Sequence, residues 1–222
     1  MTIGSLQVGN ARLRSLDLTG PAGRLEAILN EGPPEAKLAA LVCHPHPLGG
    51  GTLHNKVVYH AMKVLSGLGL PVLRFNFRGV GRSEGTYDNG RGEVEDVRTA
   101  VNWLSAEYKL PLVIVGFSFG SVMSLEACCG DVRVRALVAL GLPTHAEGRD
   151  YHYPFLARCH TPKLFISGDR DQYGPVQEVQ QIVAEAANPS KLILIPGADH
   201  FFVGKLEAMQ GALRQWLVET LL

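Results

Sequence analysis

A serine between two glycines is the strongest chemical signal in this chain. The segment Gly116-Phe117-Ser118-Phe119-Gly120 directly follows an apolar run and precedes a helical pattern. Two glycines and a serine also occur together in ordinary loops, but this position favours the G-x-S-x-G turn, which lifts the serine side chain out of a sheet. A serine hydroxyl is a weak nucleophile and needs an adjacent base that a third group orients. The motif therefore predicts that Ser118 is a nucleophile with two partners elsewhere in the chain.

The base and the acid are expected in loops that follow later strands. His200 lies in the segment GADHFF, after the last predicted strand and before the final helix. The segment GDRD follows the preceding strand and offers two carboxylates. We predict that Asp171, which lies further out on this loop, orients the base. Asp169 is the second choice and Glu147 the third. The aspartate that does not orient the base is expected to be a turn or cap residue, a common role in such loops.

A tetrahedral intermediate would also need N–H donors for its oxyanion. One donor is expected from the backbone of Phe119, at the start of the helix that follows the nucleophile. The other is expected from the loop HPHPLGGGT, residues 44–52. Its two prolines carry no N–H, which leaves His46 or Leu48, and we favour His46.

The same loop admits two other interpretations. His44 and His46, with His54 and His60 nearby, could form a metal cluster. No cysteine or acid-rich partner accompanies them, and an HExxH spacing is absent, so we predict no metal site. The three glycines before a helix could hold phosphate, but the GxxxxGK[ST] spacing is also missing. We predict no cofactor.

Side chains near these candidates could contact a substrate. Leu48, Phe201 and Phe202 are the predicted lining of a substrate pocket. Arg78 and Arg82 lie at the end of a predicted strand and could meet an acidic substrate. The favoured alternative is that these two arginines hold their own loop together through nearby carbonyl groups.

The elements that must position these residues form a repeated strand–helix pattern. Alternating residues predict an N-terminal hairpin, and short apolar runs predict strands that are buried on both faces, as in a parallel sheet covered by helices. Such alternation predicts a doubly wound α/β sheet. The hairpin strands are Leu6–Leu18 and Arg24–Leu29; the apolar runs are Ala39–Cys43, Val72–Phe77, Leu112–Phe117, Ala136–Leu140, Lys163–Ser167 and Lys191–Ile195; the helices are Thr52–Leu68, Glu93–Tyr108, one that opens at Pro175, and Leu206–Leu217.

Composition narrows the class of protein. The 222 residues include 21 basic and 21 acidic side chains, and 46% are hydrophobic. This balance argues against disorder and against electrostatic binding of nucleic acid or anionic lipid. The four cysteines do not suggest a disulfide framework or a CxxC site, and no signal-peptide or membrane-spanning pattern is present. We predict one domain over residues 1–222, in a reducing, cytoplasmic setting.

Together these motifs resemble the α/β-hydrolase superfamily along nearly the whole chain. The resemblance is carried by HPHPLGGGTLHNKV, RFNFRGVGRSEG, GFSFG, GDRD and GADHFF, and it is closest to small, lidless bacterial members related to dienelactone hydrolases and carboxylesterases. It implies a mostly parallel sheet of about eight strands with an antiparallel N-terminal hairpin and no cap domain. It also implies that Ser118, Asp171 and His200 form a triad in the chain order that this superfamily uses. Dienelactone hydrolases proper carry cysteine at the position of Ser118, which argues against that exact activity.

The prediction is a carboxylesterase-like serine hydrolase that cleaves small carboxylic esters through an acyl-enzyme. The alternatives are a hydrolase of another acyl bond (lactone, thioester or amide) and a non-catalytic binding protein on the same scaffold. The expected partner is a small-molecule ester, with no nucleic acid and no membrane, and the protein is expected to be a monomer or a homodimer.

Overall fold

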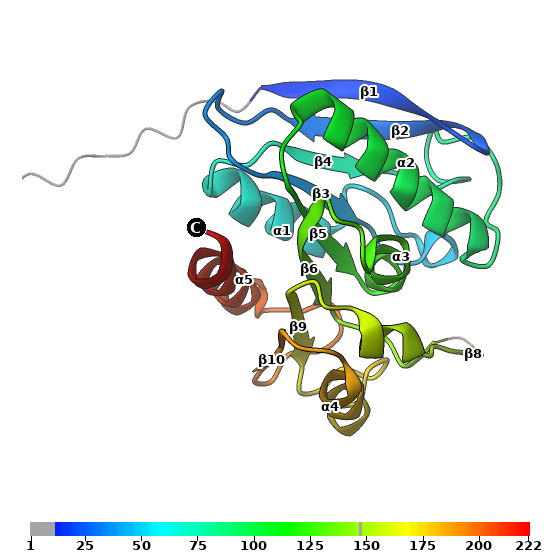
Figure 1. Ribbon diagram of the computed structural model, residues 1–222. Helices are drawn as coiled ribbons and strands as arrows, with labels where there is room; N and C mark the ends of the chain where they lie inside the picture. Colours follow the sequence, from blue (N-terminus) through cyan, green and yellow to red (C-terminus); the bar gives the residue numbers. More distant parts are fainter. Residues whose placement is uncertain (1–11, 147) are drawn as a thin grey trace, which may run out of the picture.

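A computed structural model describes residues 12–146 and 148–222. Its centre is an eight-stranded sheet with the order β1-β2-β4-β3-β5-β6-β9-β10 (Figure 1). Strands β1, β2 and β4 pair antiparallel, and every other neighbouring pair is parallel. The strands are β1 (Leu13–Gly20), β2 (Gly23–Asn30), β3 (Ala39–Cys43), β4 (Val72–Phe75), β5 (Leu112–Phe117), β6 (Val134–Leu140), β9 (Lys163–Gly168) and β10 (Ser190–Ile195).

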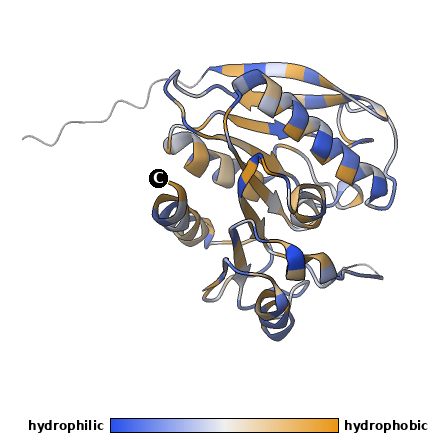
Figure 2. Ribbon diagram, viewed as in Figure 1, coloured by the Kyte–Doolittle hydropathy of each residue, from blue (hydrophilic) through white to orange (hydrophobic). Residues whose placement is uncertain are grey.

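Helices cover both faces of this sheet. The helices are α1 (Lys56–Gly67), α2 (Arg91–Tyr108), α3 (Phe119–Cys128), α4 (Val176–Glu185) and α5 (Leu206–Leu221). Helices α1 and α5 pack on one face, whereas α2 and α3 pack on the other (Figure 1). Successive strand residues point to opposite faces, so Ile114 belongs to one core while Val113 and Val115 belong to the other. This double burial explains the continuous apolar runs in the sequence, which Figure 2 shows along the central strands.

The fold agrees with the α/β-hydrolase prediction, and several predicted elements differ only at their ends. Helix α1 begins at Lys56 because the side chain of Asn55 caps its first turn, accepting from Val57 N–H at 2.9 Å. The strand predicted over Val72–Phe77 ends at Phe75. The predicted first strand begins partly outside the described residues, and β1 starts at Leu13.

The segment between β6 and β9, where a lid could be inserted, is short. Its described residues form two strands of two residues each, β7 (His145–Ala146) and β8 (Arg149–Asp150), and one 3₁₀ helix, η2 (Pro154–Arg158). The prediction of a fold without a cap domain is therefore confirmed. The sequence did not predict the β7–β8 hairpin in this segment.

One disulfide was also not anticipated. Cys129, at the end of α3, is bonded to Cys159, which follows η2. The expectation that the cysteines form no disulfide framework missed this bond, because spacing along the chain does not show which cysteines meet in space. Disulfides rarely persist in a reducing cytoplasm, so the cytoplasmic location stays a prediction.

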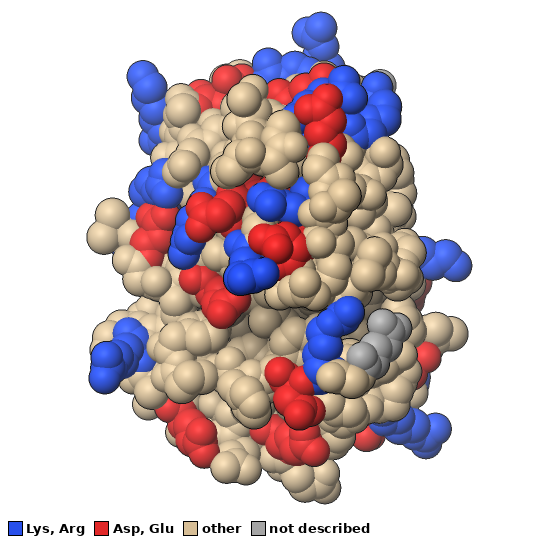
Figure 3. Space-filling view, turned by 90° about the vertical axis from the view of Figure 1, so that its right-hand side faces the viewer, with Lys and Arg blue, Asp and Glu red and all other residues tan. Residues whose placement is uncertain are grey.

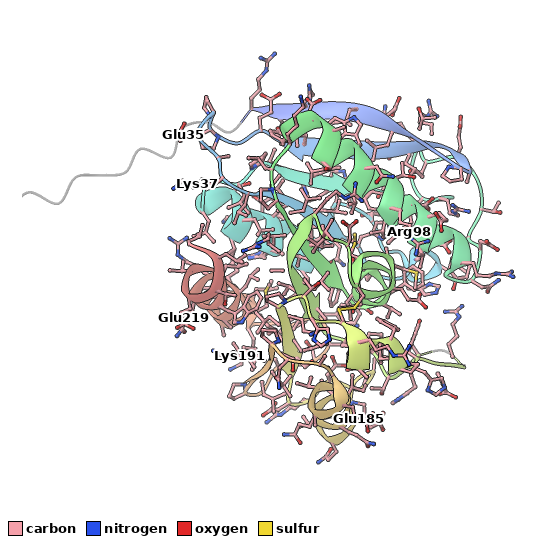
Figure 4. The ribbon with its side chains drawn as sticks, viewed as in Figure 1. Glu35, Lys37, Arg98, Glu185, Lys191 and Glu219 are labelled. Carbon is pink, nitrogen blue, oxygen red and sulfur yellow. A yellow bond between two sulfur atoms is a disulfide. The ribbon has the colours of Figure 1, made fainter. Side chains whose placement is uncertain are left out.

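Charged side chains lie mostly at the surface. The side chains labelled in Figure 4, including Arg98, Lys191 and Glu219, are exposed, and Lys191 pairs with Glu219 at 3.6 Å. No helix among residues 12–146 and 148–222 is long and apolar enough to cross a membrane. The prediction of a monomer or homodimer stays a prediction.

Candidate active site

The turn at Ser118 is a strained connection between β5 and α3. Ser118 has φ 52° and ψ −123°, a backbone conformation that non-glycine residues adopt only when the surroundings hold them there. A Cβ atom at Gly116 would lie 2.3 Å from the carbonyl oxygen of Gly120, and one at Gly120 would lie 2.5 Å from that of Cys43. Only glycine fits at either position. The flanking glycines therefore let the chain turn sharply enough to present the Ser118 hydroxyl.

His200 lies against this hydroxyl. It occupies the loop between β10 and α5, with Nε2 2.8 Å from Ser118 Oγ. Its Nδ1 lies 2.9 Å and 2.8 Å from the two carboxylate oxygens of Asp171. The carboxylate only accepts hydrogen bonds, so it favours the tautomer with the proton on Nδ1, which leaves Nε2 to accept from the serine hydroxyl. Asp171 and His200 are both buried, and their hydrogen bond is shielded from water.

Backbone groups hold Asp171 in this orientation. Its Oδ1 atom accepts from the N–H groups of Tyr173 at 2.8 Å and Gly174 at 3.1 Å. Asp169 instead accepts from Gly197 N–H at 2.7 Å, so it fastens the loop that carries the base. The two carboxylates of GDRD therefore have different partners: that of Asp171 faces His200, and that of Asp169 faces the backbone of Gly197. Glu147, the third candidate, lies outside the described residues.

Aromatic rings enclose the imidazole. The centroids of Phe117 and Phe201 lie 5.2 Å from that of His200, and the centroid of Tyr173 lies 4.8 Å away. These rings limit access of water to the His200–Asp171 pair. These ring contacts thereby help to hold the imidazole of His200 in the orientation that its hydrogen bonds define.

A cavity of about 140 Å³ opens beside Ser118. Its described lining residues are Pro45, His46, Gly49, Gly50, Gly51, Asn55, Ser118, Phe119, Pro143, Ala146, Arg149, Tyr151, Tyr173, His200 and Phe201. Of the three side chains predicted to line a substrate pocket, only Phe201 is among them. Leu48 is 69% exposed outside this lining, and Phe202 is fully buried in the core between the sheet and α5.

Figure 3 views the molecule from the side toward which β8 projects in Figure 1. It shows a hollowed surface of mostly uncharged residues between groups of charged side chains. Sequence reasoning missed Arg149, Tyr151 and Tyr173 in the cavity wall. The signal available for Tyr173 was its position two residues after Asp171. Arg149 and Tyr151 lie in the segment between β6 and β9, where the sequence predicted no strand or pocket residue.

Two backbone N–H groups near Ser118 are candidates for an oxyanion site. Phe119 is the first residue of α3, where N–H groups have no partner within the helix. The N–H group of Leu48, the other candidate in that loop, donates to Nδ1 of His46 at 3.2 Å. It is therefore already engaged in a hydrogen bond. This bond favours His46 over Leu48 as the second donor, and its role stays a prediction.

His44 is a structural residue. Its Nδ1 atom lies 2.6 Å from the carbonyl oxygen of Pro45, and its Nε2 atom accepts from Phe77 N–H at 3.0 Å. Burial lowers the pKa of His44 to about 4, so the ring is neutral at pH 7. The nearby His60 pairs with Gln210 through Nδ1 at 3.0 Å. Among residues 12–146 and 148–222, no group of three or more metal-binding side chains comes together.

The two arginines of RFNFRGVGRSEG are also engaged within the protein. Arg78 forms a buried ion pair with Asp96 at 2.7 Å, and Arg82 pairs with Glu26 at 2.9 Å. Neither lines the cavity among the described residues. The interpretation that these arginines hold their loop is therefore favoured, although carboxylates hold them rather than the carbonyl groups that were expected to dominate.

Comparisons with known proteins identify the family of this chain. A family model for the alpha/beta hydrolase domain matches residues 39–216, and the chain belongs to this family. An uncharacterized protein of Rickettsia prowazekii is 37% identical over 209 residues, which cover 90% of this chain and 86% of that protein.

Solved structures give the same result. A Xanthomonas campestris protein, described as an α/β serine hydrolase without a lid, has a TM-score of 0.81 and 34% identity, over 93% of this chain and 94% of its own. An α/β serine hydrolase homologue from Coxiella burnetii has a TM-score of 0.82 and 36% identity, over 92% of this chain and 97% of the homologue. These similarities support a hydrolase built on the lidless α/β-hydrolase fold.

Proposed function

We propose that this protein is a serine hydrolase that cleaves small carboxylic esters through an acyl-enzyme. The observation that carries the proposal is the unbroken series of hydrogen bonds from Ser118 Oγ to His200 Nε2 and from His200 Nδ1 to Asp171. This series offers a hydroxyl, a base that can accept its proton and a carboxylate that steadies the resulting imidazolium.

In the first half of the reaction, Ser118 Oγ attacks the ester carbonyl carbon while its proton moves to His200 Nε2. The oxyanion that forms accepts from the N–H groups of Phe119 and His46. As the C–O bond to the alcohol breaks, His200 returns the proton to the leaving oxygen. The products of this half are the free alcohol and an acyl group on Ser118.

In the second half, a water molecule replaces the alcohol. His200 takes a proton from this water, whose oxygen attacks the acyl carbon. Collapse of the second oxyanion breaks the bond to Ser118 Oγ, which regains a proton from His200. The carboxylic acid leaves and the enzyme returns to its starting state.

The Ser118→Ala variant tests this proposal. We expect hydrolysis of p-nitrophenyl acetate to fall about 10⁴- to 10⁶-fold and the initial burst of p-nitrophenol to disappear. Labelling by a fluorophosphonate probe should also be lost. The thermal midpoint should change little, because alanine meets the same backbone constraint at φ 52° as serine.

Ser105→Ala is the matched control, since Ser105 lies on α2 and does not line the cavity. It should keep the activity, the burst and the labelling of the wild type. Equal activity in wild type and Ser118→Ala would overturn the proposal. Absence of both turnover and labelling in the wild type would instead favour a non-catalytic binding protein.

A further inference from the structure

Arg149 brings a positive charge to the wall of the cavity beside Ser118. Among the described lining residues it is the one side chain with a permanent charge, and no aspartate or glutamate accompanies it. Many other arginines of this chain pair with a carboxylate, as Arg78 and Arg82 do. No salt bridge to Arg149 occurs within the part of the chain that the structure describes.

Two aromatic side chains orient this guanidinium. Its Nη1 atom lies 2.6 Å from Nε2 of His46, and its Cζ atom lies 5.5 Å from the ring centroid of Tyr87. Both contacts hold the group in place, and neither supplies a full negative charge. Arginine has five N–H donors in a planar fork that matches a carboxylate, and His46 engages one side of that fork.

The remaining surroundings also favour a negative group. The helices α1 and α3 both begin at the cavity, since the cap residue Asn55 and the first residue Phe119 are in its lining. Helix N-termini carry a partial positive charge. The other described lining residues are Ser118 and glycine, proline, alanine, aromatic and imidazole groups, so no anionic side chain in this lining offsets the charge of Arg149.

We infer that the substrates are esters whose acyl part carries a free carboxylate, which Arg149 binds. This inference rests on the proposed function and narrows its substrate class to monoesters of short dicarboxylic acids. The carboxylate belongs to the acyl part because that part stays bonded to Ser118 within the cavity, whereas the alcohol departs. The volume of about 140 Å³ has room for about five water-sized groups, which suits a short acyl chain.

Two esters of matched shape test the inference. Monoethyl succinate carries a carboxylate where ethyl 4-oxopentanoate carries a neutral acetyl group of similar size. The measurement is the ratio of kcat/KM for these two substrates, obtained by pH-stat titration at pH 7.5. We expect the wild type to prefer the anionic ester, and we expect the preference to weaken as salt is added.

Arg149→Met should lower the ratio about 10- to 100-fold, the range for a lost charge-assisted hydrogen bond. Arg149→Lys, which retains the charge without the fork, should fall between Arg149→Met and the wild type and also serves if the methionine variant does not fold. Arg158→Met is the control, because Arg158 lies exposed on η2 outside the cavity lining. It should keep the wild-type ratio.

The outcomes separate the two proposals. If Ser118→Ala abolishes hydrolysis of both esters but Arg149→Met leaves their ratio unchanged, the inference about Arg149 is wrong and the serine mechanism stands. A wild-type enzyme that prefers the neutral ester would also overturn the inference. If Ser118→Ala still hydrolyses both esters at the wild-type rate, the proposed function fails first.

Discussion

The buried imidazole of His44 should make the stability of this protein fall as the pH is lowered from 6.5 toward 4. Burial is the main cause of its lowered pKa, which is about 4 in the folded protein against 6.5 ordinarily. One hydrogen bond adds to this effect, whereas the contact with the carbonyl group of Pro45 opposes it. A proton on Nε2 would point at the N–H group of Phe77, which now donates to that nitrogen.

The number of protons bound by the folded and the unfolded state decides whether the free energy of unfolding rises or falls with pH. Below pH 6.5 the unfolded chain protonates this histidine, whereas the folded protein does not until about pH 4. The unfolded state therefore binds more protons in this interval, and the free energy of unfolding decreases as the pH falls. The stabilisation is fully present above pH 6.5. The difference of about 2.5 pKa units corresponds to about 3 kcal/mol, lost at up to about 1.4 kcal/mol per pH unit.

Urea unfolding between pH 4.5 and 7.5 measures this effect. The comparison is with His44→Gln, whose amide can accept from Phe77 N–H and donate to the carbonyl group of Pro45 without titrating. The carboxylates of the protein contribute equally to the pH dependence of stability in both proteins, so their contribution cancels when the two free energies of unfolding are subtracted. We expect the stability advantage of the wild type at pH 7.5 to shrink by about 2–3 kcal/mol at pH 4.5. His54→Gln, which removes an exposed histidine near the same loop, should follow the wild-type curve.

Parallel pH profiles for the wild type and His44→Gln would refute this reasoning. They would mean that the neutral ring gives no advantage to the folded state over this interval. The protonation state of His44 is relevant to the candidate site because His44 begins the loop that contains His46. Loss of the neutral ring should loosen the same loop that is proposed to supply an oxyanion donor.

Two further predictions concern carboxylates. Asp171→Asn should lower kcat about 10⁴-fold by favouring the wrong tautomer of His200, while Asp169→Asn should cost far less; a larger loss in the Asp169 variant, measured with p-nitrophenyl acetate, would exchange their roles. Asp96→Asn should destabilise the fold by about 3–5 kcal/mol, because it leaves the Arg78 guanidinium buried without its counter-charge; a thermal midpoint equal to that of the wild type would show that the pair is not needed.

Short-range rules were enough to predict the sheet and the turn at Ser118. Fully buried strands such as β5 must be apolar at every position, and α2 must place its apolar residues along one side, so both features are visible in the sequence. The nucleophile turn is equally local, because Gly116 and Gly120 are required by contacts within a few residues or with the adjacent strand. The order of Ser118, Asp171 and His200 followed from the family resemblance.

Element ends and loops required the tertiary structure. Phe202 lies two residues after His200 in the sequence, yet its positive φ turns the chain so that its side chain lies in the core while Phe201 reaches the cavity. The choice between Asp171 and Asp169 also depended on distances, because one carboxylate faces the imidazole and the other faces the backbone of Gly197. Sequence position alone could rank these alternatives without deciding between them.

What the sequence by itself determined was therefore the layered α/β sheet and the strained serine turn, and it ranked Asp171 first among the acids that could accompany Ser118 and His200. Each depends on periodicity, on local sterics or on motif order, which are properties of neighbouring residues. Only the tertiary structure decided which side chains surround the nucleophile. It brought Arg149 from the β7–β8 hairpin to His46 and joined Cys129 to Cys159, because contacts between distant segments depend on how the whole chain packs.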